Sequence, residues 1–323
     1  MIKLDDFKYV ICEGGSNKGI MYCGAYKVLC DYTDFREKLS NVKGFIGTSS
    51  GAIFALGLSI GFSPSQGMAI AKHMASSLQN VAPQMDIGML WNSFGTDDGN
   101  QMRKIIAGIL SEKGFSGDIT LSQLQHLCNN TFICVATEIP SQKAVYFNAK
   151  DHPDLKVVDA VFMSMCVPFL FRPFKYNNKL YVDGGLRANF PLSYCDAKDA
   201  FTFSFNVPED TEIKDWQGYL YNIITCSVAC QDEEKKKYIE NSVYKVSLTY
   251  PQYLRQYSSL NSHMDENLVK RFYNCGYFQA LNVFVGEIIA SMEKCLKMVI
   301  IVRVNYLYFC LSTECDEHLS TYP

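Results

Sequence analysis

A serine on a glycine-flanked turn, between a short apolar strand and an apolar helix, constrains this chain more than any other feature. The turn is Gly47-Thr48-Ser49-Ser50-Gly51, preceded by Phe45-Ile46 and followed by the apolar run 52–56. Glycine at both ends of the turn lets the two arms of backbone approach each other. A strand, a tight turn and a helix are the setting of a nucleophile elbow. Ser49 is therefore a candidate nucleophile, although the same pentapeptide also occurs in ordinary turns.

A second strand-to-helix junction lies upstream and carries a glycine-rich loop. The apolar residues 7–12 predict a buried strand, which ends in Glu13-Gly14-Gly15-Ser16-Asn17-Lys18-Gly19. A helical spacing of apolar residues follows it, at Met21, Ala25, Val28 and Leu29. Consecutive N–H groups in such a loop form an anion-binding concavity, but the spacing is not that of a P-loop or a dinucleotide fingerprint. Beside an elbow on the next strand, the loop predicts an oxyanion hole; a turn that only tightens packing is the alternative.

An aspartate ends a third apolar strand, in the segment Tyr181-Val182-Asp183-Gly184-Gly185. A carboxylate at a strand end beside two glycines is well placed to point into a cleft. An aspartate before glycine also commonly bonds its own backbone in a turn. Both interpretations of Asp183 stay open on the residues alone.

Taken in order, these motifs resemble the patatin-like phospholipase family over roughly residues 5–208. The resemblance rests on the glycine-rich loop, the elbow and the Asp-Gly-Gly. A further stretch, Ser164-Met165-Cys166-Val167-Pro168, is similar to the family's segment of small residues and proline ahead of the acidic motif. Such proteins are lipid acyl hydrolases that use a Ser–Asp dyad without a catalytic histidine.

The resemblance implies a role for each motif. Ser49 would be the nucleophile and Asp183 the base that activates it. The N–H groups of Gly14, Gly15 and Ser16 would form the oxyanion hole, and Lys18 with Gly19 would support the loop. Gly47, Gly51, Gly184 and Gly185 would shape the two turns. The chain departs from the family at Ser16, where a third glycine is usual; a positive φ there would strain a serine.

Composition narrows the class of protein. The 323 residues are 48% hydrophobic, enough for a sizeable core, and a formal net charge of −3 with a pI near 6.0 gives no reason to expect nucleic acid as a partner. The 13 cysteines contain no C-x-x-C pair, and no histidine completes a metal site with them. We expect reduced, mostly buried thiols, with Cys226 and Cys230 in the core, and neither metal nor cofactor.

The implied substrate is a membrane or micellar lipid. The N-terminus, Met1-Ile2-Lys3-Leu4-Asp5-Asp6, is too polar for a signal peptide. The apolar stretch 298–311 is too short to span a bilayer and is interrupted by Arg303 and Asn305. We expect a cytoplasmic protein with peripheral membrane contact.

Strands alternate with helices along the chain, which predicts an α/β layered fold with a mainly parallel sheet flanked by helices. Further strands are expected over residues 131–136, 144–147, 180–182 and 201–207. Residues 5–208 would form the catalytic domain, and residues 209–323 a mostly helical extension packed on the same core. In that extension the charge run 231–237 predicts a solvated helix face or loop, and 264–297 a helix.

Two other functions remain open. One is an α/β-hydrolase with a Ser–Asp–His triad, for which His263 has the right chain order after Asp183. The early elbow, with room for about two strands ahead of it, argues against this alternative. The other is a lipid-binding protein that keeps the fold without turnover, which Ser16 in the glycine loop would favour.

Overall fold

The computed structural model describes residues 2–78, 87–206, 232–257 and 264–295, together with positions 219, 223 and 226. The chain divides into one unit over Met1–Asn282 and a second over Val283–Pro323. All the described strands and all the candidate site residues lie in the first unit. The apolar stretch 298–311, His263 and Cys230 lie outside the described residues.

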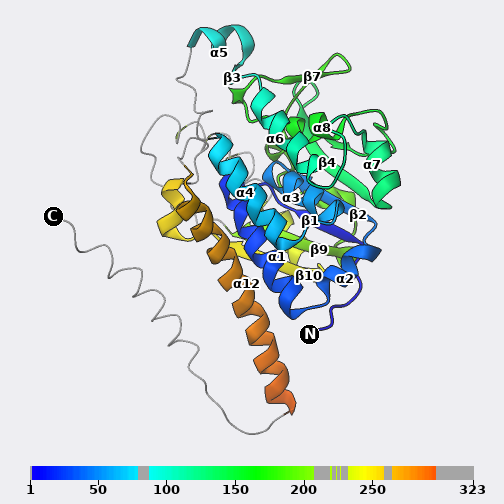
Figure 1. Cartoon of the computed structure of the whole chain (residues 1–323), viewed down its shortest axis with the longest axis vertical. Helices are drawn as coiled ribbons and strands as arrows, with labels where there is room; N and C mark the ends of the chain where they lie inside the picture. The colour runs from blue at the N-terminus through cyan, green and yellow to red at the C-terminus, as the bar shows by residue number, and fades with distance from the viewer. Residues whose placement is uncertain are drawn as a thin grey trace, which may run out of the picture. The chain divides into compact units, whose positions relative to one another are not determined.

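A mainly parallel sheet forms the centre of the first unit (Figure 1). Its parallel strands follow the order β10-β9-β1-β2-β4: Tyr244–Thr249, Ala200–Asn206, Tyr9–Cys12, Gly44–Thr48 and Thr131–Glu138. Three strands run antiparallel to their neighbours: β5 (Lys143–Phe147) and β8 (Lys179–Asp183) on β4, and β7 (Phe174–Tyr176) on β8. The predicted α/β fold with a mainly parallel sheet is confirmed. β10 also shows that residues beyond 208 contribute a strand to this sheet.

Helices connect many of the strands in the described residues. They are α1 (Ile20–Tyr32), α2 (Phe35–Lys38), α3 (Ser50–Ser59), α4 (Pro64–Leu78), α5 (Ile87–Ser93), α6 (Asn100–Ser111), α7 (Leu121–Cys128), α8 (Val157–Met165), α9 (Gly185–Ala188), α11 (Asp232–Glu240) and α12 (Glu266–Cys295). A separate two-stranded sheet joins β3 (Gly95–Asp97) to β6 (Phe169–Phe171). Figure 1 shows α1 and α4 side by side, and the two helices are in contact. None of the described helices is long and apolar enough to cross a bilayer.

One face of the sheet is covered by the helices that follow β1 and β2. Phe203 of β9 is fully buried and lies 5.1 Å, ring centre to ring centre, from Phe54 of α3. Tyr22 of α1 stacks on Phe205 at 4.5 Å and donates its hydroxyl to the Phe203 carbonyl. Since these aromatic side chains bury large apolar surfaces, they hold α1 and α3 against the sheet.

The opposite face is covered by segments from the second half of the chain. Ile11, Ile46 and Ile133 stand side by side across β1, β2 and β4 and are fully buried. Phe190, which follows α9, and Ile239 of α11 belong to the same buried cluster. Burial of both faces explains why the strands read as continuous apolar runs in the sequence.

Residues 232–237 of the charge run lie in helix α11, one of the two forms expected for them, but Lys235 departs from the expected solvated face. Glu233, Glu234, Lys236 and Lys237 are exposed, whereas the Lys235 side chain is only 12% exposed. The spacing of charges could not show that Lys235 meets a buried carboxylate from the far end of the chain.

The cysteine expectation holds only in part. Among the described cysteines, Cys12, Cys23, Cys134 and Cys166 are buried, and desolvation raises the pKa of each thiol. Cys226 is exposed, so its predicted place in the core is wrong.

Candidate active site

Ser49 occupies the sharp turn between β2 and α3. Its backbone has φ 53° and ψ −125°, a left-handed conformation that is costly for a serine. A Cβ on Gly47 would lie 2.3 Å from the Gly51 carbonyl oxygen, and one on Gly51 would lie 2.4 Å from that of Cys12. Only glycine therefore fits at either end of the turn. The result is a half-buried serine at the N-terminus of α3, where the positive end of the helix dipole lies.

The register of β4 brings Asp183 to this serine. Thr48, the last residue of β2, pairs with Val135 of β4, and Asp183, the last residue of β8, pairs with Ala136. β5 occupies the other edge of β4 over both positions. β2 and β8 therefore share one edge of β4 and run toward each other, so that their ends meet. Thr48 reinforces the junction by donating its hydroxyl to the Ala188 carbonyl at 2.8 Å.

The Asp183 carboxyl group is buried, with 7% of the residue exposed. Its Oδ1 accepts the Gly185 N–H at 2.7 Å. Desolvation raises the pKa of Asp183 from 3.8 to about 6, and the interactions of the carboxyl group with the Gly185 N–H and the Ser49 side chain oppose the rise. A carboxylate of this pKa accepts a proton more readily at neutral pH than an exposed aspartate does.

The glycine loop lies beside the elbow, but not all of its N–H groups are open. The Gly14 N–H donates to the Asn189 carbonyl at 3.0 Å, and the Gly15 N–H donates to the Ser50 hydroxyl at 3.0 Å. Gly14 thus has a backbone acceptor within the protein, whereas the acceptor of Gly15 is a hydroxyl on a rotatable side chain. The geometry supports Gly15 and Ser16 as oxyanion donors better than Gly14.

Ser16 has φ 51° and begins a short 3-10 helix over Ser16–Gly19. The strain expected for a serine at the usual third glycine is therefore present. Gly19, at the other end of this turn, packs against Ser50, whose side chain lies 3.0 Å from the position of a Cβ.

Lys18 lies within the loop and is buried, with 7% of the residue exposed. Its ammonium group lies 5.5 Å from the ring centre of Tyr250 and 5.9 Å from that of Phe205. Cation–π contact with two aromatic rings suits a lysine that supports the loop.

Ser164 is a positioning residue that sequence reasoning did not single out by itself. It is fully buried, and its hydroxyl accepts the Ser49 N–H at 2.9 Å. Its carbonyl accepts the Gly184 N–H at 3.3 Å, and the Cys166 carbonyl accepts the Asp183 N–H at 2.8 Å. The segment of small residues before the proline therefore holds both halves of the Ser49–Asp183 pair. The resemblance of this segment to the family was the sequence signal that could have pointed to Ser164.

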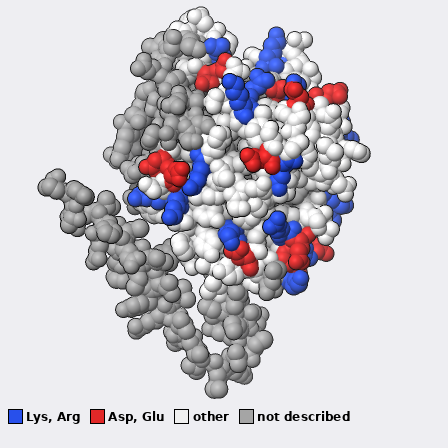
Figure 2. All heavy atoms as spheres, viewed as in Figure 1, with Lys and Arg blue, Asp and Glu red and all other residues white. Residues whose placement is uncertain are grey.

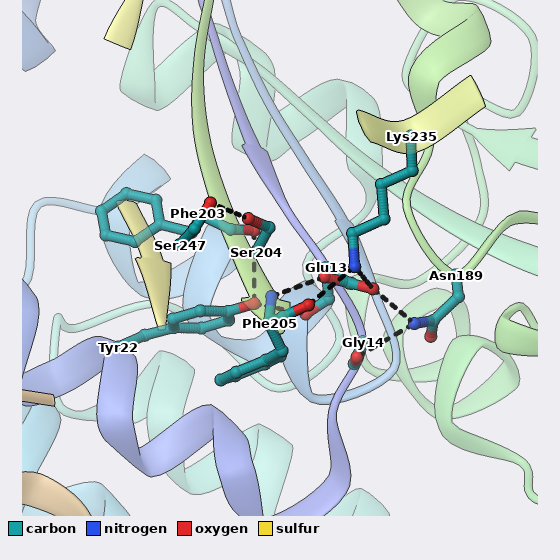
Figure 3. A network of polar contacts seen from close by, with 9 residues as sticks. All are labelled: Glu13, Gly14, Tyr22, Asn189, Phe203, Ser204, Phe205, Lys235 and Ser247. Atoms are coloured by element: carbon teal, nitrogen blue, oxygen red, sulfur yellow. Dashed lines mark hydrogen bonds and ion pairs between the residues drawn. The ribbon is translucent and has the colours of Figure 1, made fainter. Parts of the chain in front are cut away.

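Glu13 and Asn189 also contact the glycine loop and were not predicted. Figure 3 shows the Asn189 side chain directed at both Glu13 and the Gly14 carbonyl, at 3.1 and 3.2 Å. Glu13 directly precedes the glycines of the loop in the sequence, and this position could have marked it as a candidate site residue. Nothing in the sequence ties Asn189 to residues 175 positions earlier.

The described part of the chain offers no cluster of side chains for a metal ion. No group of three or more His, Cys, Asp or Glu side chains there is placed to hold a metal ion. On the face that Figure 2 shows, acidic and basic side chains are interspersed. The single histidine alternative, His263, lies outside the described residues.

Replacing Ser16 by glycine is expected to leave activity within about threefold of the parent. It should stabilise the fold by up to about 1 kcal/mol, because the relief of a left-handed serine exceeds the entropic cost of glycine. Thermal unfolding and fatty-acid release check this expectation. A gain in activity of a hundredfold would instead show that Ser16 disables the loop.

With this geometry established, comparisons with known proteins place the chain. A family model described as patatin-like phospholipase matches residues 10–196, which is more than half of the chain. The chain belongs to the patatin-like phospholipase family. The matched stretch contains the glycine loop, Ser49 and Asp183, and it ends before β9, β10 and α11.

Individual relatives share less than a third of their aligned residues with the chain. The chain is 27% identical over 186 residues to "Probable lipid hydrolase 463L" of Invertebrate iridescent virus 6. This match covers 58% of the chain and 62% of the relative. It is 30% identical over 196 residues to "Uncharacterized protein YqhO" of Bacillus subtilis, covering 56% and 64%. The chain thus spans less than two thirds of the length of these relatives. The crystal structure of VipD from Legionella pneumophila shares the fold, with a TM-score of 0.52 at 14% identity, over 87% of this chain and 67% of VipD.

Proposed function

We propose that this protein hydrolyses the carboxylic esters of glycerolipids through an acyl-enzyme intermediate on Ser49, with Asp183 as the base. The observation that carries the proposal is the buried Asp183 carboxyl group, with a pKa of about 6, beside a serine on an elbow. Family membership and the viral relative named as a lipid hydrolase favour a lipid substrate.

The proposed reaction has two acyl transfers. Asp183 takes the Ser49 hydroxyl proton while the serine oxygen attacks the ester carbonyl, which forms a tetrahedral oxyanion. The Gly15 and Ser16 N–H groups stabilise this oxyanion, with Ser50 releasing Gly15 by rotating its hydroxyl; one such donor is typically worth about 3 kcal/mol. The intermediate expels the alcohol, which receives the proton from Asp183. Water, deprotonated by Asp183, then attacks the acyl-serine. The bond to the Ser49 oxygen breaks, this oxygen takes the proton back from Asp183, and the fatty acid is released.

The chain's own groups suffice for this reaction, so the proposal includes no metal and no organic cofactor. The substrate resides in membranes or micelles, and the protein reaches it by peripheral contact from the cytoplasm. Residues 5–208 would carry the catalytic groups, and residues 209–323 would complete the core through β10 and α11.

Incubation with phospholipid vesicles tests the proposal directly. The purified chain is mixed with fatty-acid-labelled phosphatidylcholine vesicles in EDTA, and with lysophospholipid, triacylglycerol and short p-nitrophenyl esters in parallel. We expect fatty-acid release that EDTA does not abolish, and the panel ranks the lipid classes. A folded protein that sediments with vesicles but releases no fatty acid from any substrate would contradict the proposal and indicate a lipid-binding protein.

A further inference from the structure

A buried carboxylate lies at the base of the glycine loop and receives hydrogen bonds from three distant segments. Glu13 follows β1 directly and is 3% exposed. Figure 3 shows the side chains that converge on it. Its Oε2 accepts the Phe205 N–H at 2.7 Å, and its Oε1 accepts the Lys235 ammonium at 2.7 Å and the Asn189 amide at 3.1 Å.

Asn189 transmits this arrangement to the first glycine of the loop. Its carbonyl accepts the Gly14 N–H at 3.0 Å, and its side-chain amide donates to the Gly14 carbonyl at 3.2 Å. One asparagine therefore holds both polar groups of Gly14. With Gly14 held, the direction in which the next N–H groups, those of Gly15 and Ser16, point is restricted.

The Lys235 ammonium group forms an ion pair with the Glu13 carboxylate, which offsets the free-energy cost of burying that carboxylate. A buried carboxylate without a cation is strongly unfavourable, and removal of one partner of a buried pair leaves such a charge behind. The Lys235 side chain is 12% exposed, and its ammonium also donates to the Phe205 carbonyl at 2.8 Å. Lys235 belongs to α11, well beyond the stretch 10–196 that matches the family model.

We propose that Lys235 is a positioning residue for the oxyanion loop: its buried ion pair with Glu13, relayed by Asn189 to Gly14, holds the loop in its donor orientation. This inference rests on the proposed function, in which Gly15 and Ser16 bind the oxyanion. The catalytic unit then extends past the family-matched stretch and requires α11. Lys235 acts through Glu13 and contacts no reacting atom.

The test compares full-length Lys235→Met with two controls. Lys235→Arg keeps the cation, and Lys236→Met removes an exposed neighbouring lysine on the same helix. Hydrogen exchange of the amides of residues 13–19 reports on the loop without any reference to activity. Fatty-acid release gives kcat and KM.

We expect Lys235→Met to accelerate exchange in residues 13–19 roughly tenfold, with exchange in β4 unchanged. Its kcat should fall about 10- to 100-fold, because small displacements of donors are costly in catalysis. Its KM should stay within about threefold, because the donors act on the transition state. Lys235→Arg should recover most of kcat, and Lys236→Met should match the parent.

A folded Lys235→Met protein with parental loop exchange would overturn the inference, whatever its activity. So would unchanged kcat with faster exchange, because the loop's orientation would then not matter to turnover. If Lys235→Met does not fold, the double variant Glu13→Gln with Lys235→Met removes both charges and keeps the comparison possible. If the parent releases no fatty acid, the proposed function fails, and loop exchange still decides whether the ion pair holds the loop.

Discussion

Ser49→Ala is expected to lose fatty-acid release by roughly 10³-fold or more, because the acyl group then has no oxygen to which it can transfer. The variant should fold like the parent. Alanine meets the same left-handed backbone, φ 53°, that serine already adopts, and the Ser49 N–H keeps its bond to Ser164. The measurement is fatty-acid release from vesicles beside labelling by a serine-directed fluorophosphonate. Both should disappear together in the variant.

His263→Ala is the matched control for this experiment. The dyad predicts nearly full release in that variant, whereas a Ser–Asp–His triad predicts a loss as severe as that of Ser49→Ala. Release that survives Ser49→Ala would remove Ser49 as the nucleophile, and release that disappears in His263→Ala would replace the dyad by a triad.

Asp183→Asn is expected to lower kcat/KM by roughly 10³-fold or more, since an amide cannot accept the serine proton. In the parent, kcat/KM should be flat above pH 6 and fall about tenfold per pH unit below it, because only the ionised carboxylate acts as base. The pH profile of release measures this. A profile that stays flat down to pH 4 would contradict an Asp183 pKa of about 6.

The same variant is expected to be more stable than the parent near neutral pH. The pKa of Asp183 is higher in the folded protein, about 6, than its ordinary value of 3.8, so the fold favours the neutral form. The parent therefore loses stability as pH rises from about 4 through 6, by an amount on the order of 3 kcal/mol. Asparagine carries no charge and still accepts the Gly185 N–H through its carbonyl.

Denaturant unfolding of both proteins at pH 8 and pH 4 checks this expectation. Asp183→Asn should be the more stable protein at pH 8, by up to about 3 kcal/mol, and the gain should vanish toward pH 4. A variant less stable than the parent at pH 8 would show that the ionised carboxylate is stabilised in place, and would remove the physical basis for its action as a base.

The elements around the site were largely predictable because their signals are local. The strands at 131–136, 144–147, 180–182 and 201–207 appear as β4, β5, β8 and β9, each shifted by at most two residues. The helix expected over 264–297 appears as α12. The small β3–β6 sheet was not predicted, because three-residue strands carry too few side chains for a periodic pattern.

The site was predictable only where its residues lie in motifs. Ser164 stood in a stretch whose likeness to a family was noted, yet its bonds to Ser49 and Gly184 come from the packing of α8. Lys235 was predicted to be solvated with its neighbours on α11. Its partner Glu13 lies 222 residues earlier, and no periodicity in a charge run reports such a pairing.

The sequence by itself determined the local geometry: a strand, a turn that only glycine can flank, and a helix, with Ser49 at the bend. Turn sterics and apolar periodicity act over a few residues, so they can be read from the sequence alone. Tertiary structure alone decided which distant residues meet. Asp183 reaches Ser49 because β2 and β8 end against each other on one edge of β4, and Lys235 reaches Glu13 because α11 covers the sheet face beside Asn189. These contacts depend on the register of the strands and on the burial of whole sheet faces. Both are determined by many segments of the chain at once.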